Sequence, residues 1–185
     1  VMATFAMSEA LTIILKRNDP TSAAKQVSLT ELGSIKINKE ERTKMYKTIP
    51  RSSVIGFLIG VLPGAGATIA SFLAYGMERN VVSDEEKEKF GKGSVNGLSA
   101  PETANNAACS GSFVPMLTLG IPGSGTTAVM LGALLGFGVQ PGPRLYMTNP
   151  EIFWSIIMSM YIGMVILLIL NLPLIPYIAR ILAVP

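Results

Sequence analysis

Three long stretches of this sequence carry no charged side chain, and they constrain its fold more than any other feature. Residues 52–77, 103–143 and 152–179 contain no Asp, Glu, Lys or Arg. Each stretch exceeds the roughly 20 residues that a helix needs to cross the hydrocarbon core of a bilayer. Charged residues make up 15% of the chain, whereas a soluble domain carries about a quarter. The sequence therefore predicts an all-α integral membrane protein, a polytopic helical bundle.

The basic residues lie in the segments that flank these uncharged stretches. Residues 16–51 contain nine Lys or Arg against four Asp or Glu, which is typical of a cytoplasmic segment of a membrane protein. This arrangement accounts for the net charge of +3, and the chain lacks the mixture of basic and aromatic residues that single-stranded nucleic acids bind. We expect no nucleic-acid partner.

The same pattern divides the chain into three parts. Residues 1–15 are predicted to end a membrane or interfacial helix, 16–51 to form a polar cytoplasmic linker, and 52–185 to form the transmembrane transport region. Both chain ends resemble cut ends, so we expect an interior fragment of a larger permease. The chain has no histidine and one cysteine, Cys109, which we interpret as a packing residue; a metal centre and an internal disulfide are not expected.

Two breaks of similar composition interrupt the uncharged stretches, PGAGAT at 63–68 and PGSGTT at 122–127. Irregular backbone survives at membrane depth only where it is buried in protein or lines a cavity. The helix that follows each break begins with free N–H groups, which can bind an anion. Discontinuous helices of this kind form the binding sites of secondary transporters. An inter-helix turn or a kink is the alternative for each break, and the presence of two alike favours a site.

A polar cluster precedes the second break. Asn105 and Asn106 lie inside an uncharged stretch, where amide side chains need partners. Glu102 could hold a coupling cation, but Ser99 and Glu102 have the spacing of a capping box with Pro101 in the first turn, and we favour the cap. The predicted substrate and ion site therefore comprises Gly64, Ala65, Gly66, Thr68, Asn105, Asn106, Gly123, Ser124, Gly125, Thr126 and Thr127.

Two further segments have simpler interpretations. Residues 152–170 are bulky and apolar throughout, and Pro150 precedes them at an early-turn position, which predicts an ordinary membrane-spanning helix. GSGTTA at 123–128 fits a dinucleotide-binding pattern, but no acidic residue lies between Glu102 and Glu151 to bind a ribose. We reject that motif.

Taken in order, these segments resemble the large membrane subunit of the tripartite tricarboxylate transporter family. The matching residues are GVLPGAGATIASFLAYGMER (60–79), FGKGSVNGLSAPETANNAACSGSFVPMLTLGIPGSGTTAVMLGALL (90–135) and GVQPGP (138–143). The resemblance implies a permease of about a dozen helices in two related halves, located in the bacterial inner membrane. It also implies a small membrane subunit and a periplasmic substrate-binding protein as partners.

The resemblance and the breaks together predict ion-coupled, secondary active uptake of a di- or tricarboxylate such as citrate. The coupling ion is Na⁺ or H⁺, with Na⁺ held at the same breaks, and no other cofactor is expected. A passive pore for organic anions is the alternative. An intramembrane protease is a third class, which the absent histidine and the lack of intramembrane Asp count against.

The basic residues also predict a topology. With 16–51 and 79–92 on the cytoplasmic side, 52–78 forms a re-entrant hairpin with its tip at Gly64–Gly66, although a crossing stays open. Residues 104–138 then cross as a broken helix, and 152–172 return.

Overall fold

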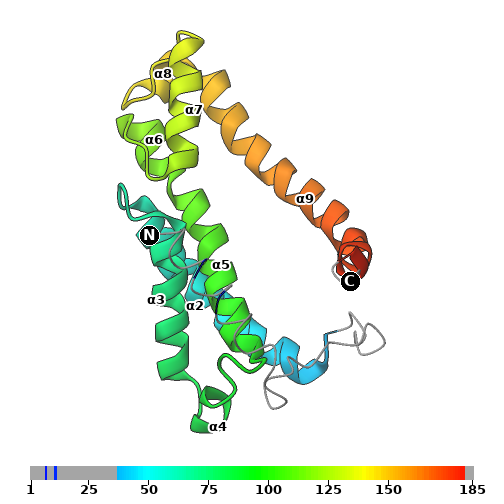
Figure 1. The fold of residues 1–185 in the computed structure, drawn as a ribbon. Coiled ribbons are helices and arrows are strands. Elements are labelled where there is room, and N and C mark those ends of the chain that lie inside the picture. The colour runs from blue at the N-terminus through cyan, green and yellow to red at the C-terminus, as the bar shows by residue number, and fades with distance from the viewer. Residues whose placement is uncertain (1–6, 8–10, 12–36, 182–185) are drawn as a thin grey trace. The chain divides into compact units, whose positions relative to one another are not determined.

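A computed structural model of the chain describes Met7, Leu11 and residues 37–181. The predicted segment 1–15 lies almost wholly outside the described residues. Contacts divide the chain into two units, and the helices discussed below belong to the unit Lys36–Leu170, except that the last turns of α9 from Asn171 onward belong to the other. The elements, shown in Figure 1, are α2 (Lys39–Val61), α3 (Gly66–Val81), α4 (Asp84–Lys87), α5 (Val95–Gly111), α6 (Phe113–Leu119), α7 (Gly125–Gly136), α8 (Leu145–Thr148) and α9 (Pro150–Ile181).

Every regular element in the described part of the chain is a helix, which confirms the predicted all-α class there. Helix α2 runs without interruption through the charged segment and into the first uncharged stretch, so residues 39–51 of the predicted polar linker are helical. Asn38 and Glu41 explain where α2 begins. Asn38 Oδ1 accepts from Lys39 N at 2.6 Å, and Glu41 accepts from Asn38 N at 2.8 Å, a reciprocal capping box.

Helices α2, α3 and α5 lie side by side (Figure 1). Thr48 in the first half of α2 contacts Glu78 near the end of α3, so the two helices form an antiparallel hairpin that turns at residues 62–65. Gly56 faces Ala104, and Gly60 faces Ala108. Since both numbers increase together, α5 runs parallel to α2.

Small residues fill the interior of this three-helix group, and bulky apolar residues cover its outside. Its buried cluster consists of Ala70, Ala74, Ala104 and Ala108. Phe72, by contrast, is 74% exposed and Leu58 is 59% exposed. A water-soluble bundle places its large apolar side chains inside. The reversed arrangement is typical of helices that pack closely within lipid.

Helix α9 is also apolar and exposed. Its segment Pro150–Ile175 is the one helix among the described residues with the length and composition to cross a membrane, and none of its most apolar window is buried. The predicted span 152–170 lies inside α9, and Pro150, predicted in the first turn, is the first residue of the helix.

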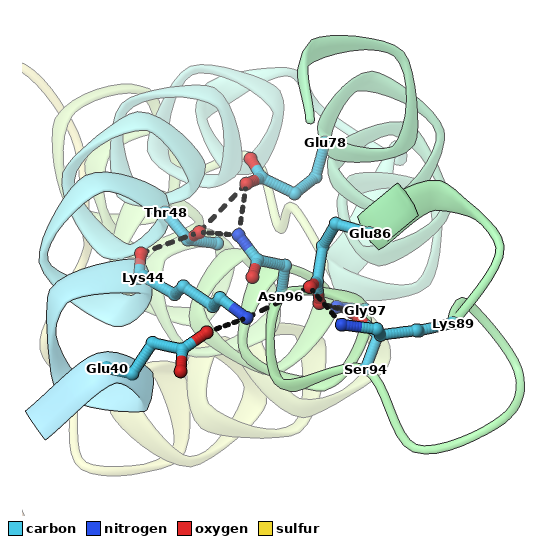
Figure 2. Close-up of polar contacts among 9 residues, drawn as sticks. All are labelled: Glu40, Lys44, Thr48, Glu78, Glu86, Lys89, Ser94, Asn96 and Gly97. Atoms are coloured by element: carbon cyan, nitrogen blue, oxygen red, sulfur yellow. Dashed lines mark hydrogen bonds and ion pairs between the residues drawn. The ribbon is translucent and has the colours of Figure 1, made fainter. Parts of the chain in front are cut away.

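A carboxylate sits fully buried where the three helices meet at the charged end of the hairpin. Glu78 on α3 is 0% exposed. It accepts hydrogen bonds from Thr48 Oγ1 at 2.8 Å and Asn96 Nδ2 at 3.0 Å (Figure 2), and from Arg51 Nη2 at 2.8 Å and Nε at 3.0 Å. Helices α2 and α5 therefore both donate to one carboxylate of α3, which fixes the register between the three helices.

A second carboxylate, Glu86 on α4, holds the connection between α3 and α5 (Figure 2). It accepts from Lys44 Nζ at 3.0 Å and from Ser94 Oγ at 2.9 Å. Burial favours a raised pKa for Glu86, but the hydrogen bonds from Lys44 and Ser94 outweigh it, and the net pKa is lowered. The same contact raises the pKa of Lys44. The segment between α3 and α5 is thus tied to α2 by charge.

The packing of α2 against α5 makes a first prediction. A Cβ on Gly56 would overlap the backbone of Ala104, whereas a Cβ on Gly76 of α3 would meet nothing within 4 Å. Gly56→Ala should therefore lower the free energy of unfolding by about 2 kcal/mol, since backbone cannot move aside as a side chain can. Gly76→Ala should raise it by up to about 1 kcal/mol. Thermal unfolding in detergent measures both, and equal melting temperatures for the two variants would refute the close packing.

The buried carboxylate makes a second prediction. Glu78→Gln leaves Arg51 without its charged partner, and removing one member of a buried pair costs up to about 3–5 kcal/mol. Because the Arg51 side chain is 32% exposed, we expect the lower part of that range or slightly less. Glu40→Gln is the matched control, since Glu40 pairs with Lys44 across one helical turn and is 75% exposed. Such pairs contribute less than about 1 kcal/mol. Denaturant unfolding should separate the two variants clearly.

Candidate functional site

The second predicted break separates two helices and is tightly ordered by its own side chains. Helix α6 ends at Gly120, which has a φ of +70°, and α7 begins at Gly125. Ser124 Oγ accepts from Thr127 N at 3.2 Å, and Thr127 Oγ1 accepts from Ser124 N at 2.8 Å. This reciprocal cap uses the Ser124 and Thr127 hydroxyls and leaves the first N–H groups of α7, those of Gly125 and Thr126, facing outward from the helix end.

The first predicted break forms the tip of the α2–α3 hairpin. Gly64 and Gly66 have φ values of +79° and +70°, which only glycine adopts readily. Ala65 between them is in the right-handed helical region. Ala65 N donates to Leu62 O at 3.2 Å and closes the turn, so the N–H groups left at the start of α3 are those of Gly66 and Ala67. No side chain caps α3 at this end.

Both breaks line a single pocket of about 510 Å³, which we call the break pocket. Its lining residues are Gly64, Gly66, Ala67, Thr68, Cys109, Ser112, Phe113, Pro122, Gly123, Ser124, Gly125, Thr126 and Thr127. The N-termini of α3 and α7 therefore open into the same space, although their first residues, Gly66 and Gly125, are 59 positions apart in the sequence. The lining carries no Asp, Glu, Lys or Arg, so the helix ends dominate its electrostatics.

The pocket brings together most of the predicted site. Thr68 and Thr126 are exposed in it, and their hydroxyls form no hydrogen bond within the described part of the chain, so they are available to a ligand. Ala65 belongs to the tip but is not a lining residue. Asn105 and Asn106 also lie outside the lining: Asn105 Oδ1 is 3.8 Å from Cys109 Sγ, and the Asn106 side chain is exposed.

The structure corrects the predicted cap at Ser99. Helix α5 begins at Val95, and its N-cap is Ser94, whose Oγ accepts from Gly97 N at 3.1 Å. Ser99 and Glu102 are consequently interior residues of α5, and Pro101 lies inside the helix. The Ser–x–x–Glu spacing was misleading because α5 begins five residues earlier. Ser94 Oγ both caps α5 and donates to Glu86, and the two contacts fix the start of the helix there.

Five lining residues are absent from the predicted site. Ala67 and Pro122 belong to the two breaks, whereas Cys109, Ser112 and Phe113 lie outside them. These last three line the pocket because the end of α5 packs against the second break. A Cβ on Gly123 would come within 2.9 Å of Ser112 Cβ and 3.4 Å of Gly60 O. No local pattern in the sequence predicts that contact, because it depends on how α2 packs against α5.

The described residues contain no group of three His, Cys, Asp or Glu side chains that could hold a metal ion. A cation in the break pocket would therefore bind hydroxyl and backbone carbonyl oxygens, which are hard ligands of the kind that alkali and alkaline-earth ions take.

Comparison of the sequence with known proteins assigns the chain to a family. The family model described as the tripartite tricarboxylate transporter TctA family matches residues 1–185. An uncharacterized 52.8 kDa protein in the TAR-I ttuC' 3' region of Agrobacterium vitis is 39% identical over 169 residues, which are 91% of this chain and 33% of that protein. An uncharacterized protein in the TAR-II ttuC' 3' region of the same organism is 46% identical over 130 residues, 70% of this chain and 53% of that protein.

The chain thus spans about a third and about half of the length of these two relatives. No solved structure matches it significantly. The family match nevertheless covers both breaks and every residue of the break pocket. The chain belongs to the tripartite tricarboxylate transporter TctA family.

Proposed function

We propose that this chain is part of a large membrane subunit that takes up di- or tricarboxylates by ion-coupled secondary active transport. The observation that carries the proposal is the convergence of two helix breaks on one pocket. Each break supplies unpaired N–H groups at the positive end of a helix dipole, which favours an anion without a buried lysine or arginine. A substrate with several carboxylates can place one at each helix end.

The dimensions of the pocket support a small organic anion. Its volume of about 510 Å³ falls within the roughly 300–1,000 Å³ of small-molecule sites. The hydroxyls of Thr68 and Thr126 supply donors for carboxylate oxygens and acceptors for a substrate hydroxyl. The same oxygens could ligate a coupling Na⁺, whereas H⁺ coupling would need a titratable group elsewhere. Asn105 and Asn106 stay predictions, and the site proposed here rests on the two breaks.

We also propose that the chain is a multi-pass segment of the bacterial inner membrane. Small residues inside the three-helix group, bulky apolar residues outside it and the exposed apolar α9 all favour lipid as the surrounding solvent. The basic residues near α4 and in the first half of α2 favour the cytoplasmic side for the base of the hairpin. The α2–α3 hairpin would then be re-entrant, α5 to α7 would cross, and residues 138–149 would face the periplasm.

The partners follow from family membership and are part of the proposal. A small membrane subunit and a periplasmic substrate-binding protein would complete the transporter, with the binding protein delivering the carboxylate to the periplasmic face. A passive pore would conduct the anion without accumulating it against a gradient, so uptake into vesicles under an imposed ion gradient separates the two.

The topology predicts opposite labelling of two exposed positions. Ser83 lies beside α4, and Met147 lies on α8 with 67% of its surface exposed. The test uses intact spheroplasts that express a permease whose other cysteines have been replaced. A membrane-impermeant maleimide should label Met147→Cys, and it should label Ser83→Cys only after the membrane is broken. Labelling of Ser83→Cys from outside would contradict the re-entrant hairpin.

The break pocket predicts the effect of filling it. A Cβ on Gly125 meets nothing within 4 Å, so Gly125→Leu should fold normally while its side chain occupies the pocket. We expect at least a tenfold loss of citrate uptake, about 1.4 kcal/mol or more of binding free energy. Gly123→Leu is a less direct test, because it would also collide with Ser112.

Gly132→Leu is the matched control for this variant. Gly132 lies on the same helix, is exposed and has equally open space at its Cβ, but it does not line the pocket. Uptake by Gly132→Leu should match that of the unmodified protein. Equal uptake by Gly125→Leu and Gly132→Leu would remove the break pocket from the transport path.

A further inference from the structure

We propose that a second pocket, centred on Arg144, is a carboxylate-binding subsite distinct from the break pocket. The identity of the ligand as a carboxylate rests on the proposed function, whereas the presence of an anion site rests on the structure alone. This pocket, which we call the Arg144 pocket, has a volume of about 440 Å³. It is formed by the loop after α7, by α8 and by the residues that lead into α9.

Arg144 stands apart from every other basic residue of the sequence. Between residues 93 and 179 it is the only Lys or Arg, and the nearest acidic residue in the sequence is Glu151. Its side chain is exposed and forms no ion pair among the described residues. By contrast, Arg51 is engaged with Glu78 and Lys44 with Glu86. The Arg144 guanidinium is therefore free to bind an anion from solution.

The rest of the pocket supplies groups that complement a carboxylate. Gln140, Thr148 and Asn149 line it together with Arg144. Gln140 forms no hydrogen bond within the described part of the chain, and its amide can donate to a ligand. The Thr148 hydroxyl donates to Arg144 O at 3.1 Å and so holds the backbone of Arg144. A guanidinium binds a carboxylate through two parallel hydrogen bonds, and neighbouring amide donors extend that recognition.

The loop that carries Arg144 is firmly held. Gly142 N donates to Leu117 O at 3.1 Å, and Val139 N donates to Leu134 O at 2.9 Å. Val139 and Leu145, on either side of the loop, are buried in the cluster around Met116. Pro141 is also buried. The backbone on both sides of Arg144 is thus anchored to α6 and α7, which lowers the entropy lost when the pocket binds a ligand.

The two pockets lie at opposite ends of α7. That helix has 12 residues, so its ends are about 18 Å apart at 1.5 Å per residue. One small carboxylate cannot touch both pockets at once. In the proposed topology the Arg144 pocket faces the periplasm, where a binding protein would release its ligand. The Arg144 pocket would therefore hold the carboxylate before it reaches the break pocket.

Uptake kinetics test this role in the complete permease with its partner subunits. Arg144→Gln should raise the KM for citrate about tenfold, the loss expected for one charge-assisted bidentate contact, with Vmax changed by less than about twofold. Arg144→Lys keeps the charge but not the paired hydrogen bonds, and should give an intermediate KM. Arg79→Gln removes the same charge from another exposed arginine without an ion pair among the described residues, and should leave KM unchanged.

Direct binding is measured by protection of an introduced thiol, independently of transport. In a Cys109→Ser background, Thr148→Cys places a thiol in the pocket, and Met147→Cys places one beside it as a control. In phosphatidylcholine proteoliposomes citrate should slow alkylation of Thr148→Cys at least fivefold, which corresponds to a binding free energy of about 1 kcal/mol at that citrate concentration. It should leave the alkylation rate of Met147→Cys unchanged. The neutral triamide of citrate should not protect, and Arg144→Gln should abolish protection.

Three results would overturn the inference. The first is an unchanged KM in Arg144→Gln. The second is the absence of citrate protection at Thr148→Cys. The third is protection by added phosphatidylglycerol that citrate cannot displace, which would assign the pocket to a lipid headgroup. Failure of the unmodified permease to accumulate citrate would instead defeat the proposed function, while thiol protection would still decide whether the pocket binds an anion.

Discussion

The close approach of α2 to α5 determines where the other parts of the site lie. Gly60 of α2 meets the backbone of Ala108, and Gly111 at the end of α5 has room for no side chain because Phe57 O and the Gly60 backbone lie against it. Gly123, in the second break, is in turn close to Ser112 and to Gly60 O. A larger residue at Gly60 would separate α2 from α5 and move the second break away from the first. The break pocket exists because these backbones are in contact.

Charge fixes the other end of the hairpin. Burying Glu78 is costly unless the carboxylate is fully hydrogen-bonded, and Thr48, Arg51 and Asn96 provide those bonds from two other helices. Because these donors lie on α2 and α5, the carboxylate opposes any sliding of one helix along another. The packed glycines and alanines set the distance between the helices, and the buried carboxylate sets their register. Together they hold the tip of the hairpin beside the start of α7, so that both line the break pocket.

Much of the fold could be predicted from the sequence, because its strongest signals are local. Runs without charge predict helices in lipid, and the paired Pro-Gly breaks predict where those helices end; α3 and α7 begin within these breaks. The start of α2 at Asn38 was missed, although its capping-box spacing is present in the sequence. The start of α5 at Ser94 was missed for a different reason. Its N-cap is stabilised by Glu86 of α4, a tertiary contact that competes with the local pattern at Ser99.

The composition of the break pocket was predictable in part, for the same reason. Backbone geometry at Gly64, Gly66 and Ser124 follows from local residue types, so these positions could be identified. The contribution of Cys109, Ser112 and Phe113 depends on which face of α5 meets the second break, and a single sequence does not contain that information. Asn105 and Asn106 were selected for their polarity, whereas the lining of the pocket depends on which positions of α5 lie beside the breaks, and Cys109 rather than either asparagine does so.

Alkylation of Cys109 can show directly whether the two breaks form one carboxylate pocket. Cys109 is the only cysteine of this chain, it lines the break pocket, and it is exposed. The measurement is the alkylation rate of Cys109 in proteoliposomes of the complete permease, with its other cysteines replaced, as the citrate concentration is raised. Saturating citrate should slow alkylation in the unmodified pocket and should have no effect when Gly125→Leu fills it. An alkylation rate that is independent of citrate, in a permease that still accumulates citrate, would show that the two breaks do not form a carboxylate pocket.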